Sequence, residues 1–265
     1  MASRAETARG PDWLAAATVL GALLLCYYVL PVLSLVASQP PETVISRLDD
    51  PSVVGAMGTS VAASTVSTAI GATFGIPLAY RLARSEGRRE TLLTALVVLP
   101  LVLPPVVSGM VLLTVVGPNT LIGELAATAG LPLTRSFAGV VLAQTFVASP
   151  FIVVTAKAAF EGVDDQLEAA SRSLGKSRAT TIRRVTLPIA WPGVLAGVTL
   201  AFARAMGEFG ATIMLAYYPR TMPVQIWVSF STAGLSEAFP VAVILLVVAV
   251  VSLVVLNALG TNPLD

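Results

Sequence analysis

Six long apolar stretches dominate this chain of 265 residues. A helix needs about 20 predominantly apolar residues to cross the hydrocarbon core of a bilayer. The six stretches are of about that length or longer, and they cover residues 13–37, 53–80, 92–116, 138–156, 192–216 and 239–259. The pattern predicts an all-α integral membrane protein with six transmembrane helices.

The composition also points to lipid as the surrounding medium. Charged residues make up 12% of the chain and hydrophobic residues 55%, whereas a soluble domain typically carries about 25% charged residues. The chain has no histidine and a single cysteine, Cys26, which excludes an internal disulfide and leaves almost no ligands for zinc or haem. The net charge of +1 provides no field that attracts nucleic acid. We expect no metal, no cofactor and no nucleic-acid partner.

No repeat, low-complexity tract or soluble segment divides the chain. We therefore expect one domain over residues 1–265, with its core in residues 53–259. The first apolar stretch exceeds the 7–15 residues or so of a signal-peptide core, so we expect it to remain as the first span. The second stretch is rich in Ser, Thr and Gly, which favours close helix packing.

The distribution of basic residues predicts the orientation, because Lys and Arg favour the cytoplasmic side. With the N-terminus inside, twelve of the sixteen basic residues fall in inner segments, and only Arg47, Arg135 and Arg220 fall in outer loops. The sixteenth, Arg204, lies within a span. The inner residues are Arg4, Arg9, Arg81, Arg84, Arg88, Arg89, Lys157, Arg172, Lys176, Arg178, Arg183 and Arg184. Six spans then place both termini in the cytoplasm.

The longest polar connection, residues 161–188, lies between the fourth and fifth spans on the inner side. Acidic residues open it near Asp164 and basic residues close it, as the helix dipole favours. Apolar residues recur within it at roughly helical spacing. We expect two short helices bent at Gly175 along the membrane surface, with Pro188 and Pro192 breaking the chain before the fifth span. Connections between packed helices usually have about 2–8 residues, so this segment is typical of a docking surface.

This segment contains Glu168-Ala169-Ala170, then Gly175 and, after nine intervening residues, Val185-Thr186-Leu187-Pro188. The pattern resembles the EAA loop of the membrane subunits of prokaryotic ATP-binding-cassette (ABC) importers, in which the loop forms a coupling helix that docks on the ATPase. That family has three residues between EAA and the glycine, and this chain has four. Counted from the glycine, the EAA positions fall on Ala169-Ala170-Ser171, one residue after Glu168. The resemblance implies coupling roles for Glu168, Ala169, Ala170, Ser171, Leu174, Gly175, Leu187 and Pro188.

The same segment nearly spells a phosphate-binding P-loop at Gly175-Lys176-Ser177. A true P-loop follows a strand and begins with a glycine, and here the first glycine position is Ala170. We interpret the match as a coincidence and expect ATP hydrolysis in a partner subunit.

Two ionisable residues, Arg204 and Glu208, lie within the fifth stretch. Charged residues inside a membrane cost about 2.5–3.5 kcal/mol each on insertion scales. Four residues apart, the two side chains share a helix face and can pair. Two interpretations stay open: a structural ion pair, or a polar element of a solute path or gate that also includes Gly207 and Gly210.

The third stretch contains the run Leu103-Pro-Pro-Val-Val-Ser-Gly109. Prolines cannot donate backbone hydrogen bonds, so the helix must kink or break at Pro100 or at Pro104 and Pro105. Unpaired carbonyls at membrane depth require protein or a wet cavity beside them. Either Ser108 and Gly109 line the solute path, or the kink serves packing alone.

Three runs extend the resemblance to the permeases of molybdate, tungstate and sulfate importers: residues 103–109 (LPPVVSG), 202–212 (FARAMGEFGAT) and 217–223 (YYPRTMP). It implies a multi-pass permease of a prokaryotic cell membrane that forms a homodimer. It would work with two ABC ATPase subunits and an extracytoplasmic solute-binding protein. Molybdate or tungstate is the first choice of solute, and sulfate or thiosulfate is the alternative.

Other classes fit less well. A secondary transporter usually shows inverted repeats and buried carboxylates for coupling ions, and this chain has one membrane carboxylate beside an arginine. A membrane enzyme needs paired acids, a histidine, or a nucleophile with a base. A channel has no need for the long inner segment. We therefore expect a transport subunit and not an enzyme.

Overall fold

The computed structural model describes residues 12–260, which fold into helices without a β-strand among them. Arg4 and Arg9, counted above for orientation, lie outside these described residues. The helices are α1 (Asp12–Ala37), α2 (Pro41–Ser46), α3 (Pro51–Ala83), α4 (Arg88–Val102), α5 (Pro105–Val116), α6 (Leu121–Thr128), α7 (Phe137–Glu161), α8 (Asp165–Ser173), α9 (Arg178–Thr181), α10 (Leu187–Met206), α11 (Gly210–Leu215), α12 (Met222–Ala233) and α13 (Leu235–Gly260). The expectation of an all-helical chain is confirmed.

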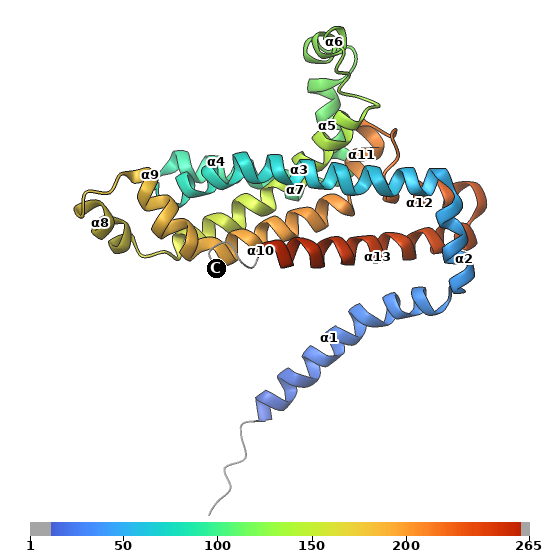
Figure 1. Ribbon diagram of the computed structural model, residues 1–265, viewed down its shortest axis with the longest axis horizontal. Helices are drawn as coiled ribbons and strands as arrows, with labels where there is room; N and C mark the ends of the chain where they lie inside the picture. Colours follow the sequence, from blue (N-terminus) through green and yellow to red (C-terminus); the bar gives the residue numbers. More distant parts are fainter. Residues whose placement is uncertain (1–11, 261–265) are drawn as a thin grey trace, which may run out of the picture.

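The long helices form a bundle in which α7 packs against both α3 and α10 (Figure 1). The small residues of α3 allow this contact. A Cβ atom added at Gly71 would lie 3.0 Å from the side chain of Ile152 and 3.3 Å from Ser149 Cβ, and one at Gly75 would lie 3.1 Å from Val153. The predicted close packing of the second span is therefore confirmed.

Five helical segments are long and apolar enough to cross a membrane: α1, α3, α7, the unit Arg178–Met206 and α13. A sixth span exists if α4 and α5 count as one, but these two are bent by 117°. The break falls at Leu103 and Pro104, and Pro105 begins α5. Pro100 lies inside α4 and does not break it. The predicted break at the proline pair is confirmed, whereas a straight third span is not observed.

The expected break before the fifth span is wrong. Helix α9, a π-helical turn over Ile182–Thr186 and α10 form one helical segment from Arg178 to Met206. Pro188 lies in the first turn of α10, directly after the wider π turn, and Pro192 lies inside the same helix. A π turn changes the backbone pairing ahead of the proline, so the missing N–H does not end the helix.

The far end of the fifth span also differs from expectation, since α10 ends at Met206 and not at Ala216. Residues 207–209 are non-helical, and the short α11 follows. Three further helices, α2, α6 and α12, fall in segments for which the sequence predicted only connections.

Two ends of the bundle differ in what they carry. Helices α8 and α9 lie at one end, and α2 with the first turns of α3 and α12 lies at the other (Figure 1). Helices α5 and α6 stand out to one side, and α1 leads away from the bundle with no buried side chain in its span. The two candidate sites below lie at the α8 end and at the junction of α10, α11 and α5.

Candidate functional site

Helix α8 begins and ends with defined caps. The Asp164 side chain accepts a hydrogen bond from Gln166 N at 2.8 Å, which satisfies an amide that the helix leaves free. At the other end Gly175 has φ +78°, a conformation that glycine adopts without a Cβ penalty. Its amide donates to the Arg172 carbonyl at 2.9 Å. The local sequence thus fixes a helix of nine residues with a sharp turn after it.

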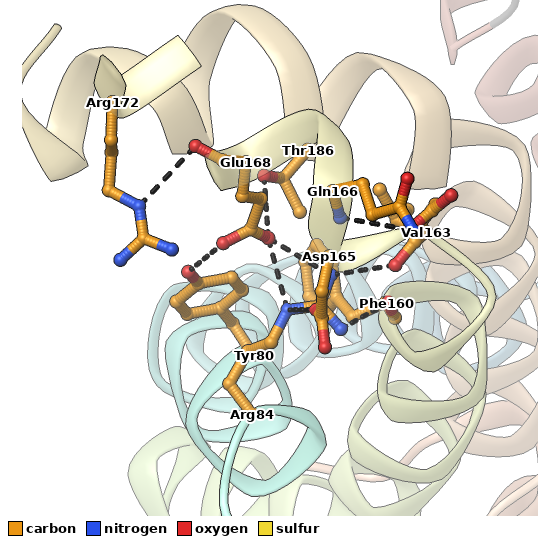
Figure 2. Close-up of polar contacts among 10 residues, drawn as sticks. Tyr80, Arg84, Phe160, Val163, Asp165, Gln166, Glu168, Arg172 and Thr186 are labelled. Carbon is orange, nitrogen blue, oxygen red and sulfur yellow. Dashed lines mark hydrogen bonds and ion pairs between the residues drawn. The ribbon is translucent and has the colours of Figure 1, made fainter. Parts of the chain in front are cut away.

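Glu168 is the one buried residue of α8, with 7% of its surface exposed. Figure 2 shows its carboxylate between Tyr80, Arg84 and Thr186. Oε1 accepts from Arg84 Nε at 3.0 Å, from Arg84 Nη2 at 2.9 Å and from Thr186 Oγ1 at 2.9 Å. Oε2 accepts from Tyr80 OH at 3.1 Å. One side chain therefore bonds α8 to the end of α3 and to the helical segment that leads into α10.

Arg84 extends the cluster to a third long helix. Its Nη1 donates to the Phe160 carbonyl at 2.8 Å and its Nη2 to the Val163 carbonyl at 3.1 Å, which are the last turn of α7 and the residue that leads into α8 (Figure 2). Arg84 also pairs with the exposed Asp165 at 3.1 Å. We call Tyr80, Arg84, Glu168 and Thr186 the Glu168 clamp.

The electrostatics of the clamp favour an ionised Glu168. Burial alone raises the pKa of this carboxyl, but the hydrogen bonds from Thr186, Arg84 and Tyr80 and the charge of Arg84 outweigh it. The pKa of Glu168 therefore lies below its ordinary value of 4.5. Hydrogen bonds to the charged form act in this direction.

The lowered pKa predicts a loss of stability in acid. A depressed carboxyl pKa contributes stability that is complete above the unfolded value, about 4.5, and is lost as pH falls through the folded value. We expect the thermal unfolding midpoint of the purified protein to fall more steeply below about pH 4.5 in the wild type than in Glu168→Gln. Parallel pH profiles for the two proteins would contradict this expectation.

The remaining face of α8 is open. Ala169 and Ala170 are exposed, and Leu174 at the end of the helix is 79% exposed. Ser171 is half-buried, and its hydroxyl lies 2.9 Å from Thr181 Oγ1. The two small alanines and the apolar Leu174 form a partly apolar surface without long side chains, next to the buried Glu168.

The residues that nearly match a P-loop lie in the turn between α8 and α9. Gly175, Lys176 and Ser177 are all exposed, and a helix precedes them where a P-loop has a strand. Ser177 accepts from Thr180 N and so caps α9. Leu187 and Pro188 lie one turn further on, in the first turn of α10.

The second group of predicted residues meets where α10 ends. Arg204 Nη1 lies 2.6 Å from Glu208 Oε2, so the predicted ion pair is confirmed. Glu208 is 1% exposed, and its Oε1 accepts from Ala211 N at 2.7 Å, in the first turn of α11. The two charged residues do not share a helix, because Glu208 lies beyond the end of α10. Gly207, directly before it, is exposed.

Helices α5 and α11 touch backbone to backbone beside this ion pair. A Cβ atom at Gly210 would lie 2.7 Å from Pro105 Cβ and 2.8 Å from Val106 N. A Cβ atom at Gly109 would lie 2.7 Å from Met214 Cβ and 2.8 Å from the Ala211 carbonyl oxygen. The structure thus brings Gly210 onto Pro105, directly after the turn at Pro104, and Gly109 onto α11.

Several buried polar side chains lie in the same membrane region. The hydroxyl groups of Ser108, Ser64 and Thr212 have no hydrogen-bond partner among the described residues, and neither has Gln144 Nε2. Gln144 Oε1 lies 3.4 Å from Ser67 Oγ. Ser108 is among the residues predicted from the sequence, whereas the Ser and Thr residues of α3 were expected only to serve helix packing.

Three members of the Glu168 clamp, Tyr80, Arg84 and Thr186, were not predicted from the sequence to contact Glu168. Arg84 counted only toward orientation, and Tyr80 only as the end of a span. Both lie more than 80 positions before Glu168, at separations of 84 and 88 residues. The sequence offered one weak signal for these contacts, an arginine one turn after a tyrosine at the inner end of a span.

Comparison with known proteins places the chain among transport components. The sequence model of a family described as "Binding-protein-dependent transport system inner membrane component" matches residues 71–261. The chain is 57% identical over 251 residues to the "Probable molybdenum ABC transporter permease protein" of Haloferax volcanii, covering 95% of this chain and 92% of that protein. It is 34% identical to the "Molybdate/tungstate transport system permease protein WtpB" of Pyrococcus abyssi, covering 90% of this chain and 92% of that one.

A solved structure has a similar fold. It is a bacterial alginate ABC transporter in complex with an alginate-bound periplasmic protein, and it superposes with a TM-score of 0.73 at 18% identity. The superposition covers 94% of both chains.

Proposed function

The chain belongs to the family of binding-protein-dependent transport system inner membrane components, and from that premise we propose that it is the permease subunit of an ABC importer for molybdate or tungstate. The solute follows from the names of relatives that are 57% and 34% identical over at least 90% of the chain. As a transport subunit it is not an enzyme, and ATP hydrolysis belongs to a partner.

The proposed assembly is a homodimer of this permease with two ABC ATPase subunits and an extracytoplasmic solute-binding protein. It lies in the cell membrane of a prokaryote with both termini in the cytoplasm. Residues 1–265 act as one membrane domain with its core in residues 53–259. The excess of basic residues around α8 supports this orientation.

Helix α8 is the proposed coupling helix, and the Glu168 clamp is the observation that carries this role. A docking element must transmit a displacement to the membrane helices, and the clamp bonds α8 to α3, to α7 through Arg84, and to the segment entering α10. Ala169, Ala170 and Leu174 would meet the ATPase. Glu168, one residue before the aligned EAA positions, holds the helix from the permease side.

The proposed gate lies where α10 stops. It comprises Arg204, Gly207, Glu208 and Gly210 of the α10–α11 junction, Pro104 at the break before α5, and Pro105, Ser108 and Gly109 of α5. A path for a dianion must release the ion as well as accept it. The ion pair between Arg204 and Glu208 is nearly neutral, and the hydroxyl of Ser108 is free of protein partners among the described residues.

The test of this function is uptake by liposomes that contain the permease with its ATPase and binding protein. We expect ATP-dependent accumulation of molybdate, with competition by tungstate stronger than by sulfate or thiosulfate. Stronger competition by sulfate or thiosulfate would reassign the solute. Full uptake by the permease without the ATPase would refute the function itself.

The coupling role predicts the result of a substitution on the open face of α8. Ala170→Arg places a long charged side chain on an exposed position, so the fold is expected to persist while docking is blocked. We expect loss of most of the ATPase from the purified complex, measured by co-purification with a tagged permease. Ala127→Arg, on the exposed face of α6, is the matched control. Equal ATPase recovery in both variants would contradict the role of α8.

A further inference from the structure

A small polar cavity lies at the end of the bundle opposite α8. It has a volume of about 180 Å³ and is lined by residues of the first turns of α3 and of the connection from α11 to α12. The polar residues in its lining are Ser52, Thr59, Tyr218 and Arg220. The proposed function and orientation place this end outside the cell.

Arg220 is the only charged residue in the lining of this cavity. It is half-buried, and its Nε has no hydrogen-bond partner among residues 12–260. The described ion pairs neutralise Arg47, Arg84, Lys157 and Arg204, but none includes Arg220. A partly enclosed guanidinium without a carboxylate leaves a positive potential in the cavity.

The guanidinium is held in place by its neighbours. Arg220 Nη1 donates to Gln225 Oε1 at 3.1 Å, and Gln225 Nε2 donates to Ser52 Oγ at 3.2 Å. The guanidinium carbon also lies 5.9 Å from the ring centre of Tyr217. Ser52 Oγ accepts this bond. This chain of bonds therefore fixes the guanidinium of Arg220 beside the cavity.

We propose that this cavity is an entry site that receives a small tetrahedral oxyanion before it passes to the membrane helices. Guanidinium groups donate paired N–H bonds to oxyanions, and Arg220 has donors left for this purpose. A water molecule occupies about 30 Å³ in the liquid, so the cavity has room for such an ion with some of its water. The assignment of the cavity as an entry site rests on the proposed function, because it requires that the protein imports its solute.

The surroundings suit a passing ion more than a trapped one. The Asp50 carboxylate accepts from Ser52 N at 2.8 Å and so adds a negative charge beside the cavity. A site on a transport path must bind weakly enough to release. The nearby carboxylate limits the affinity that Arg220 would otherwise give.

The first test compares uptake by the reconstituted transporter. We expect Arg220→Gln to lower ATP-dependent molybdate uptake roughly tenfold, the effect of one lost charge-assisted hydrogen bond, and Arg220→Lys to restore part of it. Arg135→Gln removes an exposed charge from another outer loop and serves as the matched control. Uptake by Arg220→Gln within twofold of the control would overturn the proposal. Absence of molybdate uptake by the wild type would instead refute the proposed function.

The second test detects the ion in the cavity without transport. In a Cys26→Ala background, Thr59→Cys is expected to react several-fold faster with a negatively charged thiol reagent than with a positively charged one. Arg220→Gln should abolish this preference, and millimolar molybdate should slow the labelling in phospholipid-free detergent. An unchanged preference in Arg220→Gln would overturn the proposal. So would protection that appears only with anionic phospholipid, because the site would then hold a lipid headgroup.

Discussion

Glu168→Ala is expected to lower the free energy of unfolding of the permease by about 3–5 kcal/mol. The substitution leaves the Arg84 guanidinium, whose side chain is 12% exposed, without its buried partner. It also frees Tyr80 and Thr186 from their shared acceptor. The measurement is the unfolding of the purified dimer by chemical denaturant.

The same substitution is expected to separate ATP hydrolysis from transport. If α8 is the coupling helix, as proposed above, loss of the clamp leaves Ala169 and Ala170 exposed for the ATPase but removes the bonds that would carry a displacement to α3 and α10. We expect ATP hydrolysis to continue in assembled complexes while molybdate uptake falls by an order of magnitude or more, since a coupling energy of about 1–3 kcal/mol corresponds to a factor of roughly 5–150.

A matched control comes from the exposed ion pair of Lys157 and Glu161 near the end of α7. Surface pairs contribute about 0–1 kcal/mol, so Glu161→Ala should change stability and uptake little. Equal effects of Glu161→Ala and Glu168→Ala would show that the clamp has no special role.

Gly210→Ala is expected to lower molybdate uptake as strongly as Glu168→Ala does, but for a different reason. The added methyl group would lie 2.7 Å from Pro105 Cβ and 2.8 Å from Val106 N, and backbone atoms cannot turn aside as a flexible side chain can. Overpacking of this kind costs about 1–3 kcal/mol, which α5 and α11 can relieve only by moving apart. We expect assembly with the ATPase to persist and uptake to fall roughly tenfold or more, as such energies imply.

Gly58→Ala tests whether the contact, and not the loss of a glycine, is responsible. No heavy atom lies within 4 Å of a Cβ placed at Gly58, and alanine favours a helix by about 1 kcal/mol relative to glycine. This variant should transport at the wild-type rate. A Gly210→Ala protein that transports equally well would mean that α5 and α11 need no close contact.

Features that are local in sequence were predictable. The length of the apolar stretches predicted the spans, and the proline pair predicted the break before α5. The small residues of α3 predicted its close contact with α7. Asp164 and Gly175 gave the limits of α8. Each of these follows from one residue type or from a short pattern.

Features that depend on distant or competing groups were not predictable. The partners of Glu168 come from α3, and no pattern in that helix announces them. The apolar stretch that continues to Ala216 predicts a fifth span running through Glu208, but α10 ends at Met206. Gly207 and Gly210 lie close together in the sequence and favour an end to the helix at this point. The prediction of a break at Pro188 was wrong. The helix continues through this proline because a π turn precedes it.

The π turn before Pro188 has a mechanical consequence. It joins α9 to α10 in one helical segment of 29 residues, about 44 Å long at 1.5 Å per residue. Such a rod has no joint between the clamped Thr186 and the ion pair at Arg204. A displacement at one end of this segment would therefore move the other end, because the segment would translate or rotate as a rigid body. The first interruption of this helical segment is the three-residue gap before Gly210, so motion imposed from the α8 end would change the shape of the chain there.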